Sequence, residues 1–289
     1  MILESGPFPS GEHAMCRWLA YSGVPVSMDT LLFQPHNSLI RQSLSAQRSI
    51  VPTNGDGFGL GWYADLPHPG LFRDTMPAWN DSNLRSLSEQ IRSPLFFAHV
   101  RASTGTATTR LNCHPFRYGR RLFMHNGKIG GYLQLRRELE HMIKPEYFLS
   151  REGSSDSELM FYLLLGNGLT RDPKAAFART IGDILALMQR HEIEEPFRVA
   201  AALADGQRIM ALRWSSDGKS PTLFYGTGSD VSIEQGDVRF TDGSGCVLVL
   251  SEPLDEVSDH WHEVGESSFL VVEDNAVNVQ RFEPAMIAA

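Results

Sequence analysis

Cys16 is the residue of this chain whose type and position point most directly to nucleophilic chemistry. It lies in the stretch MCRWLAY (15–21), where a methionine directly precedes a cysteine although fourteen residues come before them. A thiol needs a nearby base to become a competent nucleophile. If Cys16 is the first residue of the mature chain, its own α-amino group, with a reference pKa of about 7.7–8.0, can accept the thiol proton. With residues 1–15 attached, the same nitrogen is an amide and cannot act as that base.

Other motifs that suggest a cofactor fail on spacing. In NGDGFGLGW (54–62), the last glycine of a dinucleotide-binding G-x-G-x-x-G would fall on Leu60, Trp62 or Ala64, so we interpret these glycines as structural. The sequence also lacks G-x-x-x-x-G-K-[ST]. We therefore expect no nucleotide cofactor.

The histidines raise the alternative of a metal site. His99, Cys113, His114 and His125 lie near the ends of expected strands, but no H-x-E, C-x-x-C or H-E-x-x-H spacing links them. We expect no metal, and we interpret Cys113 as a small buried residue.

The bulk composition is that of a globular protein of one large or two ordinary domains. The 289 residues carry 34 acidic and 26 basic side chains, a net charge of −8, which argues against general binding to nucleic acids or anionic membranes. Three cysteines without a CxxC pair favour a reducing cytoplasm over a disulfide scaffold. The first fourteen residues do not resemble a secretory signal, and no apolar run reaches the length of about 20 residues needed to span a membrane.

The pattern along the chain is strands, then helices, then strands again. This order lacks regular βαβ alternation and favours two mainly antiparallel sheets with helices packed outside, an α+β fold. We expect short helices in 28–33 and 36–47, capped by Asp29 and Asn37, and a turn at Asn126–Gly127. The segment 226–245 is either an exposed loop or a weak hairpin. Longer helices are expected over 131–143, from 154 onward and over 173–191, and strands over 16–22, 57–65, 93–103, 121–127, 198–204, 207–214, 221–226, 246–250 and 268–273.

Six motifs in order make the chain similar to a known family. MCRWLAY, NGDGFGLGWY, FFAHVRAST, NCHPF, FMHNG and SSDSE resemble the class II glutamine amidotransferases, which are N-terminal-nucleophile hydrolases with cysteine as their first residue. The likeness is strongest over residues 16–160. Within the family, the chain resembles stand-alone members: the γ-glutamyl hydrolase subunit of glutathione-degrading complexes, bacterial amidotransferases, and a related group that acts in ergothioneine synthesis.

The resemblance implies a fold and a set of roles. The fold is an αββα sandwich, with the amidotransferase domain over 16–280, an N-terminal extension over 1–15 and a C-terminal tail over 281–289. Cys16 is the implied nucleophile, and Asn126 with the backbone N–H of Gly127 forms the implied oxyanion hole.

The resemblance also implies which residues bind the substrate. Arg101 grips the substrate α-carboxylate, Asp156 accepts the α-ammonium, and Thr104 lies in the same substrate loop. No cofactor is implied. The run from Ala102 to Gly105 differs from the Trp-Ala-Thr-His of many ammonia-supplying relatives, which implies a differently shaped pocket.

Three functions stay open at this point. The chain is a cytoplasmic hydrolase of a γ-glutamyl amide, either glutamine or a γ-glutamyl peptide such as glutathione. Alternatively, it is an amidotransferase subunit that passes ammonia to a separate acceptor enzyme, or a catalytically silent γ-glutamyl-binding protein. The expected partners are a small γ-glutamyl substrate and a separate peptidase or acceptor subunit, with no nucleic acid and no membrane.

The extension before Cys16 has three explanations. Met15 is the true initiator and is removed, residues 1–15 are a propeptide, or the chain is inactive as written. We favour Met15 as initiator because methionine before a small cysteine is readily removed, and we therefore expect the cellular form to begin at Cys16.

Overall fold

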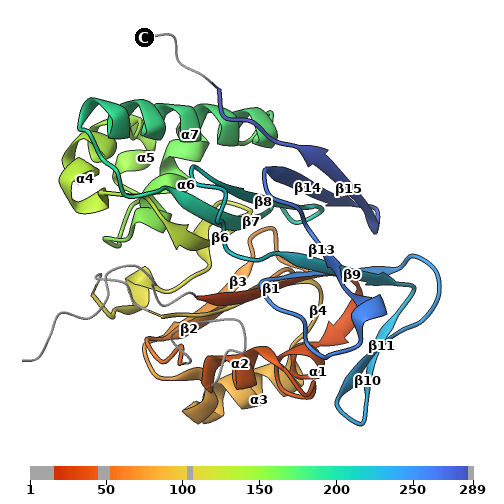
Figure 1. Cartoon of the computed structure of the whole chain (residues 1–289). Helices are drawn as coiled ribbons and strands as arrows, with labels where there is room; N and C mark the ends of the chain where they lie inside the picture. Colours follow the sequence, from red (N-terminus) through yellow and green to blue (C-terminus); the bar gives the residue numbers. More distant parts are fainter. Residues whose placement is uncertain (1–15, 45–52, 103–106, 286–289) are drawn as a thin grey trace, which may run out of the picture.

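Two sheets packed face to face, with helices on both outer sides, form the architecture of the computed structural model (Figure 1). The structure describes residues 16–44, 53–102 and 107–285. The predicted extension 1–15 and the predicted substrate-loop residue Thr104 lie outside the described residues. The expected αββα sandwich of the α+β class is confirmed.

The seven-stranded sheet carries the beginning of the described chain. All its hydrogen-bonded neighbours run antiparallel. In spatial order its strands are β13 (His262–Glu263), β9 (Phe224–Gly228), β12 (Cys246–Leu250), β1 (Arg17–Ser27), β4 (Arg92–Val100), β2 (Phe58–Trp62) and β3 (Gly70–Asp74).

The six-stranded sheet lies opposite and is also antiparallel between neighbours. Its strands in order are β15 (Ala276–Arg281), β14 (Ser268–Glu273), β8 (Ile209–Ser215), β7 (Arg198–Ala204), β6 (Arg121–Lys128) and β5 (Phe116–Tyr118). The segment 226–245 contains a separate hairpin of β10 (Val231–Glu234) and β11 (Asp237–Phe240), which confirms the hairpin alternative.

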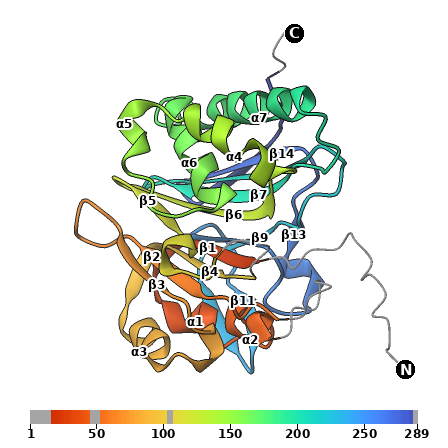
Figure 2. The ribbon, with the colours of Figure 1, turned by 90° about the vertical axis from the view of Figure 1, so that its left-hand side faces the viewer.

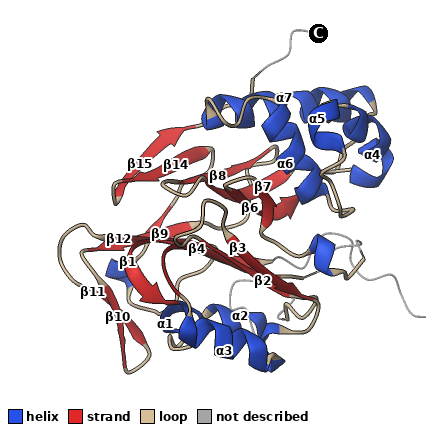
Figure 3. Cartoon of the chain, turned by 180° about the vertical axis from the view of Figure 1, so that it is seen from behind, coloured by secondary structure: helices blue, strands red, loops and turns tan. Residues whose placement is uncertain are grey.

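Helices cover the outer face of each sheet (Figures 1, 2 and 3). The seven-stranded sheet is covered by α1 (Met28–Leu32), α2 (Leu39–Leu44) and α3 (Ser82–Gln90). The six-stranded sheet is covered by α4 (Tyr132–His141), α5 (Pro145–Phe148), α6 (Asp156–Gly166) and α7 (Pro173–Arg190). Three 3₁₀ turns complete the described elements: η1 (Ala78–Asn80), η2 (Arg110–Asn112) and η3 (Ser258–His260).

Two of the expected helix caps are wrong. Ser27, not Asp29, is the N-cap of α1, and Asp29 lies in the first turn of that helix. The Asn37 side chain is turned away from α2, because its Nδ2 donates to the Glu252 carboxylate at 3.2 Å and to the Pro253 carbonyl at 2.7 Å. Ser38 holds the start of α2 instead, where its Oγ accepts from the Arg41 N–H at 3.3 Å.

The expected turn at Asn126–Gly127 is also wrong. Both residues remain within β6 and pair with Ala200 and Val199 of β7. Gly127 has a φ of +141°, and a Cβ at this position would lie 2.0 Å from the Arg198 carbonyl oxygen. The glycine is needed for that close approach to β7 rather than for a turn.

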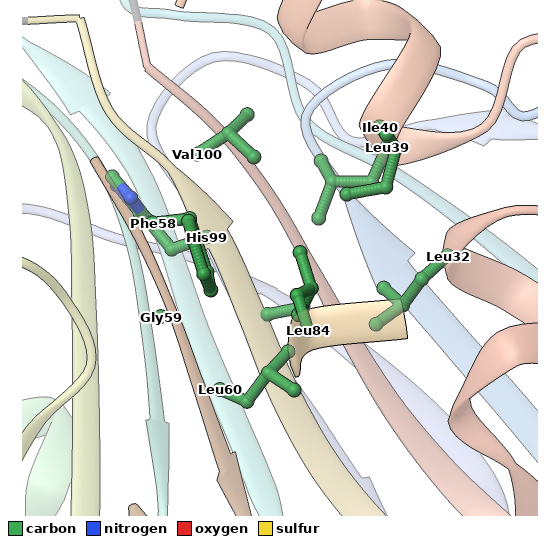
Figure 4. Close-up of a pocket in the computed structure, with 10 residues that line it drawn as sticks. Leu32, Leu39, Ile40, Phe58, Gly59, Leu60, Leu84, His99 and Val100 are labelled. Carbon is green, nitrogen blue, oxygen red and sulfur yellow. The ribbon is translucent and has the colours of Figure 1, made fainter. Parts of the chain in front are cut away.

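The core has three apolar layers, which follow from the period of two along each strand. In β1, Trp18 and Ala20 face the opposite sheet, while Leu19 and Tyr21 face α1–α3. The outer layer under α1–α3 contains a small void of about 10 Å³, shown in Figure 4. Its lining is mainly apolar, with Leu32, Leu60 and Leu84 among the side chains, so it offers room for about one water and none for a substrate.

The last part of the described chain packs onto the helical layer. Phe282 belongs to the core between the six-stranded sheet and its helices, and the N–H of Ala285 donates to the Ala178 carbonyl of α7 at 2.9 Å. Residues up to Ala285 therefore contribute contacts to the core.

Candidate active site

Strand register brings Cys16 beside Arg101 at one end of the seven-stranded sheet. Arg17 pairs with Val100 and Trp18 with His99, so Cys16 and Arg101 extend the same antiparallel ladder. Both have the parity of residues that face the opposite sheet, because Trp18 of β1 and Phe97 of β4 belong to the layer between the sheets. Strand pairing thus directs a thiol and a guanidinium toward the same space.

Asn126 approaches this space from the other sheet. On β6 the inward-facing residues are Leu122 and Met124, and Asn126 continues that series. A hydrogen bond between the sheets fixes the alignment: the Trp18 indole Nε1 donates at 3.3 Å to the carbonyl of Ala200, the residue that pairs with Asn126. The start of β1 and the end of β6 therefore lie at the same end of the sandwich.

Direct contacts surround the thiol of Cys16, which is partly exposed. The Ala102 N–H donates to Cys16 Sγ at 3.4 Å, and the thiol reaches the Ala102 carbonyl at 3.5 Å. Burial raises the pKa of the Cys16 thiol, whereas the Ala102 N–H and the charges of Arg101 and Arg17 act to lower it. Burial prevails, so the thiol is protonated at neutral pH and needs a base before it can attack.

Arg17 anchors the backbone of the nucleophile. Its Nε donates to Glu252 at 3.0 Å, in an ion pair whose side chains are 1% and 2% exposed. Its Nη1 donates to the Cys16 carbonyl at 3.1 Å. The carbonyl of Cys16 is therefore held in place by a guanidinium that is itself fixed by a buried carboxylate.

Arg101 is buried, with 4% of its surface exposed. Its Nη1 donates to the Asp56 carbonyl at 3.3 Å, and its Nη2 donates to the Ala107 carbonyl at 3.4 Å. The backbone is also fixed, since the Arg101 N–H donates to Gly57 and the Arg101 carbonyl accepts from Asp56. A planar guanidinium fixed in this way is suited to bidentate binding of a carboxylate.

The Asn126 side chain is 2% exposed, and its Nδ2 has no hydrogen-bond partner among the described residues. A buried amide donor without a partner is costly in a folded protein and is normally satisfied by a ligand or by water. The Asn126 Nδ2 is therefore a donor still available to a ligand between the sheets.

Asp156 begins α6, one residue after the N-cap Ser155, whose Oγ accepts from the Glu158 N–H at 3.2 Å. Its Oδ2 accepts from the Ile129 N–H at 3.0 Å, and its Oδ1 accepts from the N–H and the Oγ of Ser157 at 2.8 and 3.3 Å. A carboxylate has about four acceptor positions, so these three bonds leave capacity for a further donor. The Asp156 charge acts on Cys16, where it raises the pKa of the thiol.

Sequence reasoning missed the groups that hold Asp156 and Asn126 together. His125 points to the helical side of β6, where its Nδ1 lies 2.9 Å from Ser157 Oγ. Burial lowers the pKa of His125 against the opposing charge of Asp156, so the ring is neutral at pH 7. His125 occurs in the motif FMHNG and Ser157 in the motif SSDSE, but no periodicity indicates that these two side chains touch.

His99 and His114 form a second buried histidine contact next to this site. Their rings stack with centroids 4.2 Å apart, and their four ring nitrogens have no hydrogen-bond partner within the described ranges. Burial and the charge of Arg101 lower the pKa of His99 to about 3. Cys113 is fully buried, as expected, and burial raises its pKa to about 11.

Metal and membrane features can be assessed for the described residues. In residues 16–44, 53–102 and 107–285, no cluster of three or more His, Cys, Asp or Glu side chains has the geometry to hold a metal ion. Within the same ranges, no helix has both the length and the apolar character needed to cross a bilayer.

This sandwich, with a cysteine directly before an inner strand, is the fold of the N-terminal-nucleophile hydrolases. The family model for "Glutamine amidotransferases class-II" matches residues 36–287, and the chain belongs to that family. The matched range begins after Cys16, so the placement of the thiol rests on the geometry above.

Known relatives cover nearly the whole chain. It is 34% identical to the probable glutamine amidotransferase DUG3 of Saccharomyces cerevisiae, over 91% of this chain and 83% of that protein. It is 26% identical to the γ-glutamyl-hercynylcysteine sulfoxide hydrolase of Mycolicibacterium smegmatis, over 92% of this chain and 99% of that protein. A solved glutamine aminotransferase class-II domain protein from Silicibacter pomeroyi superposes with a TM-score of 0.70, at 33% identity, over 93% of this chain and 100% of that chain.

These comparisons confirm the sequence prediction at the level of the family. The chain belongs to the class II glutamine amidotransferases, a family of enzymes.

Proposed function

We propose that the chain hydrolyses a γ-glutamyl amide, and that Cys16 is the N-terminal nucleophile that forms a γ-glutamyl thioester. The observation that carries the proposal is the environment of the sulfur. Cys16 Sγ lies 3.4 Å from the backbone nitrogen of the residue after Arg101, and the charges of both Arg101 and Asp156 act on it. A thiol that feels the charges of both a cation and an anion fits a substrate that carries an α-carboxylate and an α-ammonium.

Two groups bind the glutamyl part of the substrate in this proposal. Arg101 pairs with the α-carboxylate, and Asp156 accepts a hydrogen bond from the α-ammonium through its remaining acceptor position. Thr104, outside the described residues, belongs to the same substrate loop in the proposal. These contacts place the γ-carbonyl next to Cys16.

The chemistry then proceeds through two acyl-transfer steps. The free α-amine of Cys16 takes the thiol proton, and the sulfur attacks the γ-carbonyl carbon. Asn126 Nδ2 and the Gly127 N–H donate to the resulting oxyanion. When the tetrahedral intermediate collapses, the C–N bond breaks and the leaving amine receives the proton from the α-ammonium of Cys16. Water, activated by the same amine, then adds to the thioester, releasing glutamate and restoring the thiol.

This mechanism requires that nothing is attached to the nitrogen of Cys16. We propose that the mature chain begins at this residue, with residues 1–15 as an extension that the active form lacks, and that the domain expected over 16–280 also takes in the residues up to Ala285 that pack onto the helical layer. We assign the reaction to the cytoplasm because Cys16, Cys113 and Cys246 are all free thiols.

The substrate in the proposal is glutamine or a γ-glutamyl peptide such as glutathione. The γ-glutamyl substrate named for the Mycolicibacterium smegmatis relative supports this class. The leaving amine is either released or passed to a separate peptidase or acceptor subunit. No cofactor enters the mechanism.

The test is Cys16→Ala in protein whose N-terminus has been verified as Cys16. Glutamate release from a panel of glutamine, glutathione and other γ-glutamyl amides should be abolished, while L-glutamate still binds. The matched control is Cys246→Ala, since Cys246 is buried in β12 and faces α1–α3; this variant should remain active.

Several results would overturn parts of the proposal. Activity that survives Cys16→Ala would show that another group is the nucleophile. Activity that appears only after a second protein is added would favour the ammonia-supplying subunit. Glutamate binding without any turnover by the trimmed wild type would favour a silent binding protein.

A further inference from the structure

Asn112 is a buried polar residue to which the proposed mechanism assigns no role. It ends the short η2 turn, is 1% exposed, and begins the motif NCHPF. Its side chain lies between two segments that are far apart in the sequence, one leading from Arg101 and one leading to Asp156.

On the Arg101 side, the contact is with a backbone carbonyl. Asn112 Nδ2 donates to the Ala107 carbonyl at 2.8 Å, and the same carbonyl accepts from Arg101 Nη2 at 3.4 Å. The position of this carbonyl therefore helps to set where the guanidinium lies, and Asn112 fixes the carbonyl.

On the Asp156 side, Asn112 contacts the segment just before the helix. Its Nδ2 donates to Ser154 Oγ at 3.1 Å, and its Oδ1 accepts from the Ser154 N–H at 2.8 Å. A Cβ on the adjacent Gly153 would lie 2.6 Å from Asn112 Oδ1, so the loop passes tightly against the amide. Ser154 lies two residues before Asp156, and its carbonyl accepts from the Tyr132 hydroxyl at 2.9 Å.

Both donors and the acceptor of a single amide are thus used to join these two segments. We propose that Asn112 is a positioning residue that sets the separation between Arg101 and Asp156. By doing so, it makes the site select ligands that carry both a free α-carboxylate and a free α-ammonium. The inference rests on the proposed function, which assigns these two groups to the glutamyl end of the substrate.

The amide is chemically specific for this task. Aspartate at position 112 would lose the donors to Ala107 and Ser154 and would place a second anion near Asp156. Alanine would remove all three bonds and leave the Ala107 carbonyl and the Ser154 N–H without this partner. Either change lets the two segments move relative to each other.

The experiment compares two ligands that differ only in the α-ammonium. Calorimetry measures the dissociation constants of L-glutamate and of glutarate for the wild type, Asn112→Ala and Asn112→Asp, each with its N-terminus verified. Asn167→Ala is the matched control, because Asn167 also uses its Nδ2 for two side-chain bonds, to Thr180 and Asp183, at the end of α6 away from the site. Hydrolysis of γ-glutamyl amides is followed in parallel.

We expect the preference for glutamate over glutarate to fall by about tenfold or more in both Asn112 variants, the size of one lost hydrogen bond to a charged group. Asn167→Ala should keep the wild-type preference. A merely structural role would weaken both ligands equally and leave their ratio unchanged. If the ratio is unchanged while the folded variants still bind, the inference is wrong.

The outcomes also separate this inference from the proposed function. A wild type that prefers glutamate but hydrolyses no γ-glutamyl amide overturns the proposed function and leaves the binding test of Asn112 valid. A wild type that hydrolyses these amides, with variants that keep the preference, overturns the inference alone. A wild type that binds neither ligand overturns both.

Discussion

Two buried asparagines at this site differ in how their amides are used. Asn112 uses both of its amide donors and its acceptor in hydrogen bonds to Ala107 and Ser154, which lie in loops. Asn126 lies in a regular strand, yet its Nδ2 has no partner in the part of the chain that the structure describes. The fully hydrogen-bonded amide of Asn112 therefore fits a scaffolding role. The unpaired donor of Asn126, held by rigid β-structure, is available for a ligand or a transition state.

Asn126→Ala is expected to give the largest effect on turnover among the changes that spare the nucleophile. Removal of one oxyanion donor costs about 10²–10³-fold in kcat in comparable sites, with a much smaller change in KM. Steady-state kinetics on the chain that begins at Cys16 measures both values. Because the lost Nδ2 has no partner in the ranges that the structure describes, the free energy of unfolding should change little.

Asn112→Ala is the contrast to this variant. It should lower the free energy of unfolding by roughly 1–3 kcal/mol, because it removes the three hydrogen bonds of a side chain that is buried in the wild type. The free energies of unfolding of the two variants are measured in urea and compared. If Asn126→Ala proves the more destabilising of the two, or leaves kcat unchanged, the division between the two asparagines is wrong.

A smaller effect is expected from His99, whose ring also lacks partners among the described residues but is not aimed at the substrate in the mechanism. Burial lowers its pKa from 6.5 to about 3 in the folded state. Between these values the unfolded chain binds the proton and the folded chain does not. His99 therefore costs no stability above pH 6.5 and progressively destabilises the fold as the pH falls toward 3.

In the wild type, His99 is expected to lower the free energy of unfolding by up to about 1.4 kcal/mol for each pH unit below 6.5, and the variant His99→Asn should not show this decrease. The measurement is the urea unfolding free energy from pH 7 to pH 5, compared with the wild type. His141→Asn, at an exposed position at the end of α4, is the control and should keep the wild-type slope. A slope unchanged by His99→Asn would show that this histidine does not titrate on unfolding in that range.

The sequence predicted the strongly patterned elements well. β4, β7, β12 and α7 lie close to the expected ranges because their apolar runs are long. α3 was missed because only Leu84 and Ser88 of its nine residues are buried, which gives almost no apolar stripe.

The edge strands were missed for a related reason. β15 is largely exposed and contains polar residues, so its strand conformation depends on pairing with β14 rather than on its own pattern. At Asn126–Gly127 the local preference for a turn was overridden, because the pairing of β6 with β7 continues through both residues.

The candidate site was predictable in its members but not in its supporting contacts. Cys16, Arg101, Asn126 and Asp156 each belong to a recognisable motif. By contrast, the bonds of Asn112 to Ser154 and of His125 to Ser157 join segments 42 and 32 residues apart. Such contacts depend on how loops meet at the end of a sandwich, which no local pattern encodes.

The central claim is that the thiol of Cys16 works only with the free amine of its own residue. The most direct measurement is the intact mass of the purified protein together with its specific γ-glutamyl hydrolase activity, for the natural form and for a form in which residues 1–15 are retained. The account predicts that the active protein begins at Cys16 and that retention of the extension abolishes turnover. Full activity of a protein that still carries Met1 would contradict it.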